Sequence, residues 1–101
     1  MVPGVITSIV LLHVDVARIP ETATALAGIA SVSEVYSVTG DWELVAMVRV
    51  RTHDEIAEVV TNQIAKVEGI TGTHTMIAFR AYASHDLERL WGVGFDDAEG
   101  I

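Results

Sequence analysis

Several kinds of residue are missing or scarce in this chain, and each shortage argues against a class of protein. The 101 residues include no cysteine, which excludes disulfides and thiolate sites. Six basic residues against 14 acidic ones give a net charge of −8, so unaided nucleic-acid binding is not expected. The longest unbroken apolar run is Leu44 to Val48, whereas a membrane-spanning helix needs about 20 such residues. Since the first four residues also lack a basic leader, we expect a cytoplasmic protein without direct membrane contact.

Aromatic residues are also few, although half of the chain is hydrophobic. The apolar mass is therefore Val, Ile, Leu and Ala, and it exceeds what one small core usually takes up. A second buried surface, supplied by another copy of the chain, would account for the excess. The length has room for one domain, which we place at residues 1–83. A short helix over 84–91 and an acidic tail complete residues 84–101.

The stretch that organises the chain is 32–50, where two strand-like runs flank the corner Thr39-Gly40-Asp41-Trp42. The second run places Leu44, Ala46, Val48 and Val50 at period two, the spacing of one strand face. Gly and Asp suit a tight connection between two strands. Tip residues are usually small and polar, so we expect Trp42 to be covered by a neighbouring chain or to form the wall of a pocket.

The remaining elements follow from periodicity and from helix-terminus signals. Residues 5–14 are apolar on both faces, as in a central strand. A helix is predicted from Pro20 to Ser31, and a second one from a capping box at 52–55 to a C-terminal glycine, Gly69. The last strand is predicted at 70–82. Two βαβ halves predict an α+β, ferredoxin-like split with a four-stranded antiparallel sheet and both helices on one side. Val45 and Met47 would then lie on the open face, where a second sheet could pack to form a dimeric α/β barrel.

Two short motifs and one longer run carry a resemblance to a known family. The run VSEVYSVTGDWEL, Val32 to Leu44, is close to the pattern V-x-x-V-x-x-V-T-G-x-[YW]-[DE]-L. The motif VEGI at 67–70 leads into the last strand, and Phe79-Arg80 lies near the end of that strand. With these motifs, residues 6–82 resemble the C-terminal effector-binding domain, or RAM domain, of the Lrp/AsnC feast/famine transcriptional regulators. A strand that starts by Val5 is preceded by no helix-turn-helix, so a stand-alone RAM domain is expected.

The resemblance also implies how such a domain works. It implies homodimers through the sheet faces, assembly of dimers into a ring, with an octamer as the expected size, and no cofactor. A small effector, often an amino acid, would bind between dimers near the hairpin corner. A full-length Lrp/AsnC regulator would be a further partner through mixed assembly.

The predicted effector site combines the hairpin corner with the start of the last strand. Gly40 exposes a backbone N–H for a carboxylate, Asp41 could take an ammonium group, and Trp42 could cover the ligand's side chain. The resemblance brings the last strand near the effector. The full set is Thr39, Gly40, Asp41, Trp42, Glu43, Thr73, His74 and Thr75. An ordinary turn with an interface aromatic, beside an exposed strand of β-branched threonines, would account for the same residues.

Two groups of charged or titratable residues receive simpler interpretations. The histidines at 13, 53, 74 and 85 never stand two, three or four residues apart, so no metal site is expected. Arg49 and Arg51 should lie on the open face and pair with carboxylates such as Glu34.

Other functions stay open at this point. An enzyme on the related dimeric α+β barrel, such as a cofactor-independent monooxygenase or an isomerase, would use His13, His74 or Trp42. No catalytic residue is predicted, because no base stands at a readable spacing from an orienting carboxylate. An ACT-like domain would place its site at residues 15–19, which contain no glycine. A ring former without any ligand is a further alternative. The sequence favours a non-enzymatic, oligomeric amino-acid sensor.

Overall fold

The sheet is built around its central strand β1 (Ile6–Val14), which pairs antiparallel with β3 (Leu44–Val50) and with β4 (Ile70–Ile77). At one edge β2 (Val32–Ser37) pairs with β3, so the strand order is β2-β3-β1-β4. This computed structural model describes residues 4–82. The order and pairing are those of a ferredoxin-like split. The predicted α+β fold is therefore confirmed.

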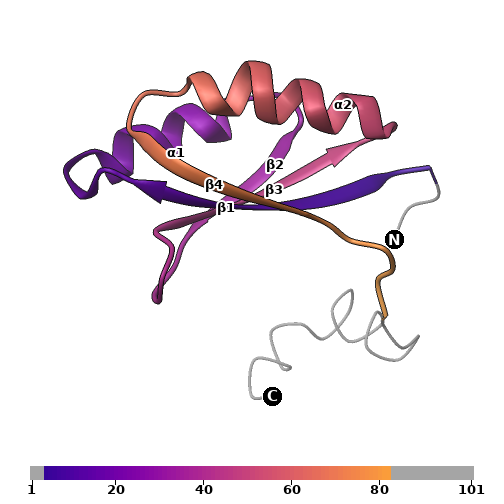
Figure 1. The fold of residues 1–101 in the computed structure, drawn as a ribbon, viewed down its shortest axis with the longest axis horizontal. Helices are drawn as coiled ribbons and strands as arrows, with labels where there is room; N and C mark the ends of the chain where they lie inside the picture. Colours follow the sequence, from indigo (N-terminus) through magenta and orange to yellow (C-terminus); the bar gives the residue numbers. More distant parts are fainter. Residues whose placement is uncertain (1–3, 83–101) are drawn as a thin grey trace, which may run out of the picture.

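The helices fill the connections after β1 and β3, and both lie on the same side of the sheet (Figure 1). α1 (Ile19–Ala27) follows a 3-10 turn at Val16–Arg18. α2 (His53–Glu58) continues through a π-helical turn, Val59–Gln63, and a 3-10 turn, Ile64–Lys66. The predicted capping box is present: the Glu55 N–H donates to the Thr52 hydroxyl at 3.2 Å, and the Thr52 N–H donates to the Glu55 carboxylate at 3.0 Å. Both amides would otherwise lack a partner at a helix start.

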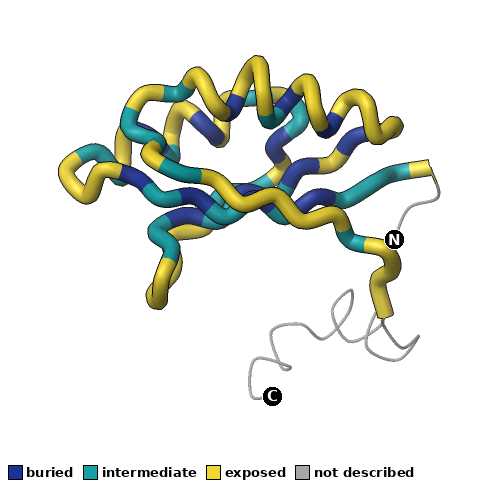
Figure 2. Tube along the Cα trace, in the orientation of Figure 1, coloured by how far each residue is buried: buried dark blue, intermediate teal, exposed yellow. Residues whose placement is uncertain are grey.

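The hydrophobic core lies between the sheet and the two helices, where Figure 2 shows the buried residues. Alternate residues of β1 and β3 point into it, which confirms the period-two prediction for the third strand. Leu26 of α1 and Ile64 close the core from the helix side. The hydrophobic strand residues with no exposed area are Val10, Leu12, Leu44, Ala46 and Val48. Aliphatic burial of this kind contributes about 25 cal/mol per Å² and dominates the stability of small domains.

The opposite sheet face carries no helix, and we call it the open face. Its apolar members are Ile9 and Leu11 of β1, Val45 and Met47 of β3, and Met76 of β4. Ile9 lies opposite both Met47 and Met76, so these side chains form one apolar strip across three strands. All but Met76 are half-buried. The prediction that Val45 and Met47 lie on this face is confirmed.

The turn before β4 contacts the end of β1 and the helix α1. Gly69 has the positive φ that was predicted, +102°, but the helix already ends at Lys66 and Val67 is extended, so Gly69 lies in the turn and not at the predicted C-terminal position of the helix. Its carbonyl accepts the Asp15 N–H at 2.8 Å, while the buried Thr22 hydroxyl donates to the Glu68 carbonyl at 2.9 Å. A side chain at position 69 would meet Thr22 well inside van der Waals contact. The turn therefore requires glycine for both backbone and packing reasons.

Two other predicted boundaries were also wrong. The last strand was predicted to reach Tyr82, but β4 ends at Ile77, and the Ala78 N–H donates to the Thr7 carbonyl at 2.9 Å. Since β1 begins at Ile6, little strand is left for later residues to pair with. The first helix was predicted to end at Ser31, but α1 ends at Ala27 because Gly28 follows it. The predicted helix and tail after residue 83 lie outside the described residues.

Candidate functional site

Trp42 does not extend from the hairpin tip but folds back over the end of the open face. Its ring stacks on the His13 ring, with centroids 3.9 Å apart and planes 15° apart. On the neighbouring strand, the His74 ring lies 6.1 Å from Trp42 at 37°. The hairpin corner and the ends of β1 and β4 are thus joined by three aromatic rings, which we call the ring cluster.

Strand register explains why these rings meet. His13 lies opposite Gly72, and Leu11 lies opposite His74, so both histidines share the open face. A Cβ atom at Gly72 would lie 3.4 Å from the His13 ring, at the near limit of ordinary van der Waals contact. Gly72 therefore packs directly beside the His13 ring on which Trp42 stacks.

Glu43 fastens the corner to β1. Its carboxylate accepts the Val14 N–H at 2.8 Å and lies 3.4 Å from Nδ1 of His13. Its own N–H donates to the Leu12 carbonyl at 3.1 Å, and its carbonyl accepts the Val38 N–H at 3.0 Å. The regular pairing of β1 with β3 ends at Leu12. The Glu43 carboxylate thus accepts the N–H of Val14, which lies beyond the end of the β1–β3 pairing.

Glu43 should make the stability of the domain depend on acid. The hydrogen bond from the Val14 N–H, followed by that from His13, holds the pKa of the Glu43 carboxyl below its ordinary value of 4.5. A carboxyl with a depressed folded-state pKa stabilises the fold above its unfolded pKa, and this stability is lost as pH falls through the folded value. The thermal midpoint of the wild type should fall as the pH drops below about 4.5. We expect a smaller fall in Glu43→Gln, because glutamine has no carboxylate to protonate. The measurement is thermal unfolding between pH 7 and pH 3. Glu21→Gln, an exposed α1 residue, is the control and should leave the acid dependence unchanged; an equal change in both variants would contradict the assignment.

The eight predicted site residues divide into three groups. Trp42, Glu43 and His74 gather at the ring cluster. Thr39, Gly40 and Asp41 form an exposed tip, and within residues 4–82 the Thr39 and Asp41 side chains make no hydrogen bond or ion pair. Thr73 and Thr75 lie opposite Leu12 and Val10, so they share the helix-covered side of β4 and face away from the cluster. The prediction that Thr73 and Thr75 contact the effector together with His74 remains a prediction, and this geometry argues against it.

His13 was missing from the predicted site, although it is the residue on which Trp42 stacks. A signal was present in the sequence, since His13 shares a strand face with Ile9 and Leu11 at period two. What could not be read was the fold-back of the tryptophan. Among the described residues, no group of three histidine, aspartate or glutamate side chains could hold a metal ion.

The fold and the corner geometry together define a RAM-type ligand-binding domain, and comparison with known proteins agrees. The family model described as the Lrp/AsnC ligand binding domain matches residues 7–87. The chain belongs to this family. It is 30% identical over 77 residues to the HTH-type transcriptional regulator FL11 of Pyrococcus furiosus, covering 76% of this chain and 50% of FL11. The chain thus spans about half the length of such curated relatives.

Solved structures extend the likeness to the whole described domain. The protein TTHA0845 from Thermus thermophilus is 43% identical with a TM-score of 0.74, covering 78% of this chain and 99% of that one. AsnC of Escherichia coli has a TM-score of 0.73 at 23% identity, covering 81% of this chain and 55% of that one. The latter likeness shows the fold. No helix within residues 4–82 is long and apolar enough to cross a membrane.

Proposed function

We propose that this chain is a non-enzymatic, cytoplasmic sensor whose copies assemble through the open face and bind an amino acid or related metabolite at the hairpin corner. The observation that carries the proposal is the fold-back of Trp42 onto His13 beside an exposed Thr39-Gly40-Asp41 tip. An aromatic wall next to a carboxylate suits a small zwitterion, since the carboxylate can accept hydrogen bonds from the ligand's ammonium group and the rings can pack against its side chain.

The assembly of dimers into a ring, with eight subunits as the expected size, is part of the same proposal. The exposed tip offers few contacts of its own, so a neighbouring dimer would have to complete the pocket. The apolar strip of the open face supports pairing of subunits, because a small monomer rarely leaves such a strip in water. Curated relatives are named as transcriptional regulators, and we propose mixed assembly with such a DNA-binding relative as the output.

One fold neighbour has been solved with an amino acid. A transcriptional regulator from Neisseria meningitidis was crystallised as a complex with L-methionine, and its TM-score to this chain is 0.70 at 10% identity. At that identity the likeness shows the fold alone. The choice of an amino acid for this chain therefore rests on the carboxylate and the ring wall.

Thermal unfolding in the presence of each of the twenty amino acids tests the proposal. A ligand that binds only the folded assembly should add about 2.7 kcal/mol at 100 times its dissociation constant. We expect one amino acid to raise the midpoint, and Asp41→Asn to abolish that rise while light scattering shows the same assembly. Glu21→Ala, which removes a negative charge on the helix side, should respond like the wild type. If no amino acid shifts the midpoint, the corner is an ordinary turn.

A further inference from the structure

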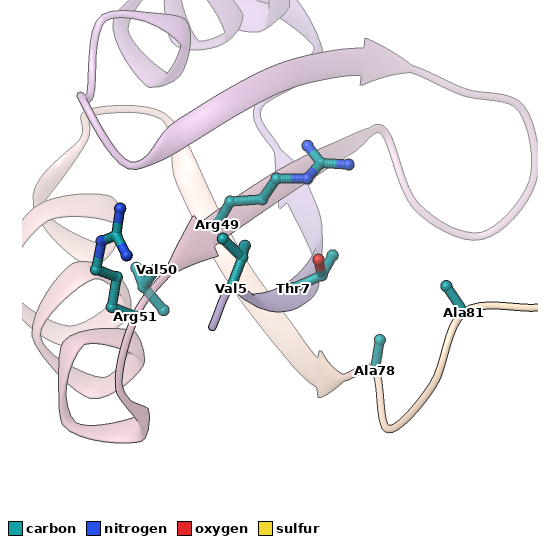
Figure 3. A pocket seen from close by; sticks show the side chains of 7 residues that line it. All are labelled: Val5, Thr7, Arg49, Val50, Arg51, Ala78 and Ala81. Atoms are coloured by element: carbon teal, nitrogen blue, oxygen red, sulfur yellow. The ribbon is translucent and has the colours of Figure 1, made fainter. Parts of the chain in front are cut away.

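A cavity lies at the opposite end of the open face from the ring cluster. Its volume is about 570 Å³, and it is lined by Val5, Thr7, Arg49, Val50, Arg51, Ala78 and Ala81. Figure 3 shows the two arginines on one side, the alanines on the other, and Val5 and Thr7 between them. This volume falls in the usual range for sites that enclose small molecules, about 300–1,000 Å³. None of the eight residues predicted for the effector site lines it.

Basic residues gather around this cavity, although the chain as a whole is acidic. The chain as a whole carries a net charge of −8, and residues 4–82 hold five basic side chains. Three of these, Arg49, Arg51 and Arg80, fall on or between the segments that line the cavity. An anion repelled by the rest of the surface would thus meet a local attraction here.

The two lining arginines are not equivalent. Arg49 donates hydrogen bonds to the Glu34 carboxylate, at 2.7 Å, and to the Ser33 hydroxyl. The predicted pairing of Arg49 with Glu34 is thus confirmed. The hydrogen bond from Arg49 lowers the pKa of the Glu34 carboxyl. Arg51 is exposed, and within residues 4–82 its guanidinium makes no hydrogen bond or ion pair. One cationic group is therefore free to bind a ligand.

The surroundings set the charge and shape of that ligand. The Glu55 carboxylate accepts the Arg51 backbone N–H at 3.1 Å, so a second negative charge stands near the rim. A dianion such as phosphate would be repelled by it, whereas one carboxylate matches one guanidinium. The walls are otherwise small and apolar. No carboxylate lines the cavity itself, so an ammonium group would find no acidic partner among the lining residues, which favours an acid without an ammonium group over a zwitterionic amino acid.

We propose that this cavity binds a monocarboxylic acid with an apolar body and no ammonium group, held by Arg51 with the Thr7 hydroxyl beside it. The site is separate from the hairpin corner. A domain that senses an amino acid at one end of its open face would then respond to a different, purely acidic metabolite at the other.

Calorimetric titration of the full chain with hexanoate tests the proposal, with the methyl resonances of Val5, Val50 and Ala78 reporting the place of binding. We expect hexanoate to bind and to shift these resonances. Arg51→Gln should weaken binding about tenfold or more, because it removes a charge-assisted hydrogen bond. Lys66→Gln loses the same charge at an exposed position outside the cavity and should bind like the wild type. Hexanamide, which lacks the charge, and acetate, which lacks the body, should both bind at least about tenfold more weakly.

Three results would overturn the proposal. The first is equal affinity of Arg51→Gln and Lys66→Gln for hexanoate, and the second is equal binding of hexanamide and hexanoate. The third combines two observations. The wild-type chain does not respond to hexanoate, and replacing Asp96, Asp97 and Glu99 by neutral residues in the full chain shifts the Val5 and Val50 resonances. That pattern would assign the cavity to the chain's own acidic end. The amino-acid response and its loss in Asp41→Asn are measured separately, so failure here leaves the effector proposal standing.

Discussion

Replacing Gly69 by alanine is expected to lower the free energy of unfolding by about 3 kcal/mol, from a strained backbone and a steric clash together. At φ +102° an L-residue is strained, and the new Cβ would strike the hydroxyl oxygen of buried Thr22. That hydroxyl now donates to the Glu68 carbonyl, so moving it also disturbs the turn into β4. Urea unfolding of the two proteins measures the difference.

The chain offers a matched control for this effect. Gly40 has φ +111°, but a Cβ placed there would meet nothing within 4 Å. Gly40→Ala should therefore show the backbone strain alone, about 1 kcal/mol. Combining Gly69→Ala with Thr22→Ala should destabilise by less than the two changes added, with a coupling of about 1 kcal/mol or more. Equal losses for the two glycine variants would show that the contact with Thr22 is unimportant.

If copies of the chain pair through the open face as proposed, replacing Met47 by lysine is expected to turn that assembly into monomers. Met47 lies at the β3 end of the apolar strip, opposite Ile9 of β1 and Glu34 of β2. In a sheet-to-sheet dimer its side chain would be enclosed, and enclosing an ammonium costs several kcal/mol of hydration, which the Glu34 carboxylate opposite position 47, already paired with Arg49, would offset only in part. At about 1.4 kcal/mol per factor of ten, the dissociation constant should rise about 1,000-fold or more.

Light scattering across a dilution series measures this change, and far-UV circular dichroism shows whether the fold survives. The fold should survive, because Met47 points away from the core and is half-exposed in the isolated chain. Thr24→Lys adds the same charge at an exposed position of α1 and should leave the assembly as in the wild type. An unchanged assembly in Met47→Lys would place the subunit contact on another surface.

The two ends of the open face carry groups of opposite charge. At one end Trp42, His13 and His74 form an apolar ring surface beside an exposed acid, Asp41. At the other end a cavity carries the free guanidinium of Arg51. A dimer built on this face would hold both ends close to the subunit boundary, so occupancy of either site could alter how copies associate.

The sequence by itself determined the fold class and most of the local structure. Period-two alternation over Leu44 to Val50 identified the face of β3 that becomes buried, and Thr52 with Glu55 identified the start of α2. These features depend on side-chain period and on satisfying backbone groups, which neighbouring residues decide. The hairpin motif around Gly40 identified the family for the same reason, since a tight corner restricts which residues can stand there.

Only the tertiary structure decided where the functional side chains lie. The stacking of Trp42 on His13 depends on the β1–β3 register, which pairs Leu12 with Leu44 and so brings the corner before β3 to the end of β1; register is a property of the assembled sheet. Period two already predicts that Thr73 and Thr75 face away from His74, but only the β1–β4 register shows that the threonines lie on the helix side and His74 on the open face. The cavity at Arg51 likewise joins residues from the start of β1, the end of β3 and the segment after β4. Contacts between residues so far apart in the chain come from packing, which local sequence does not encode.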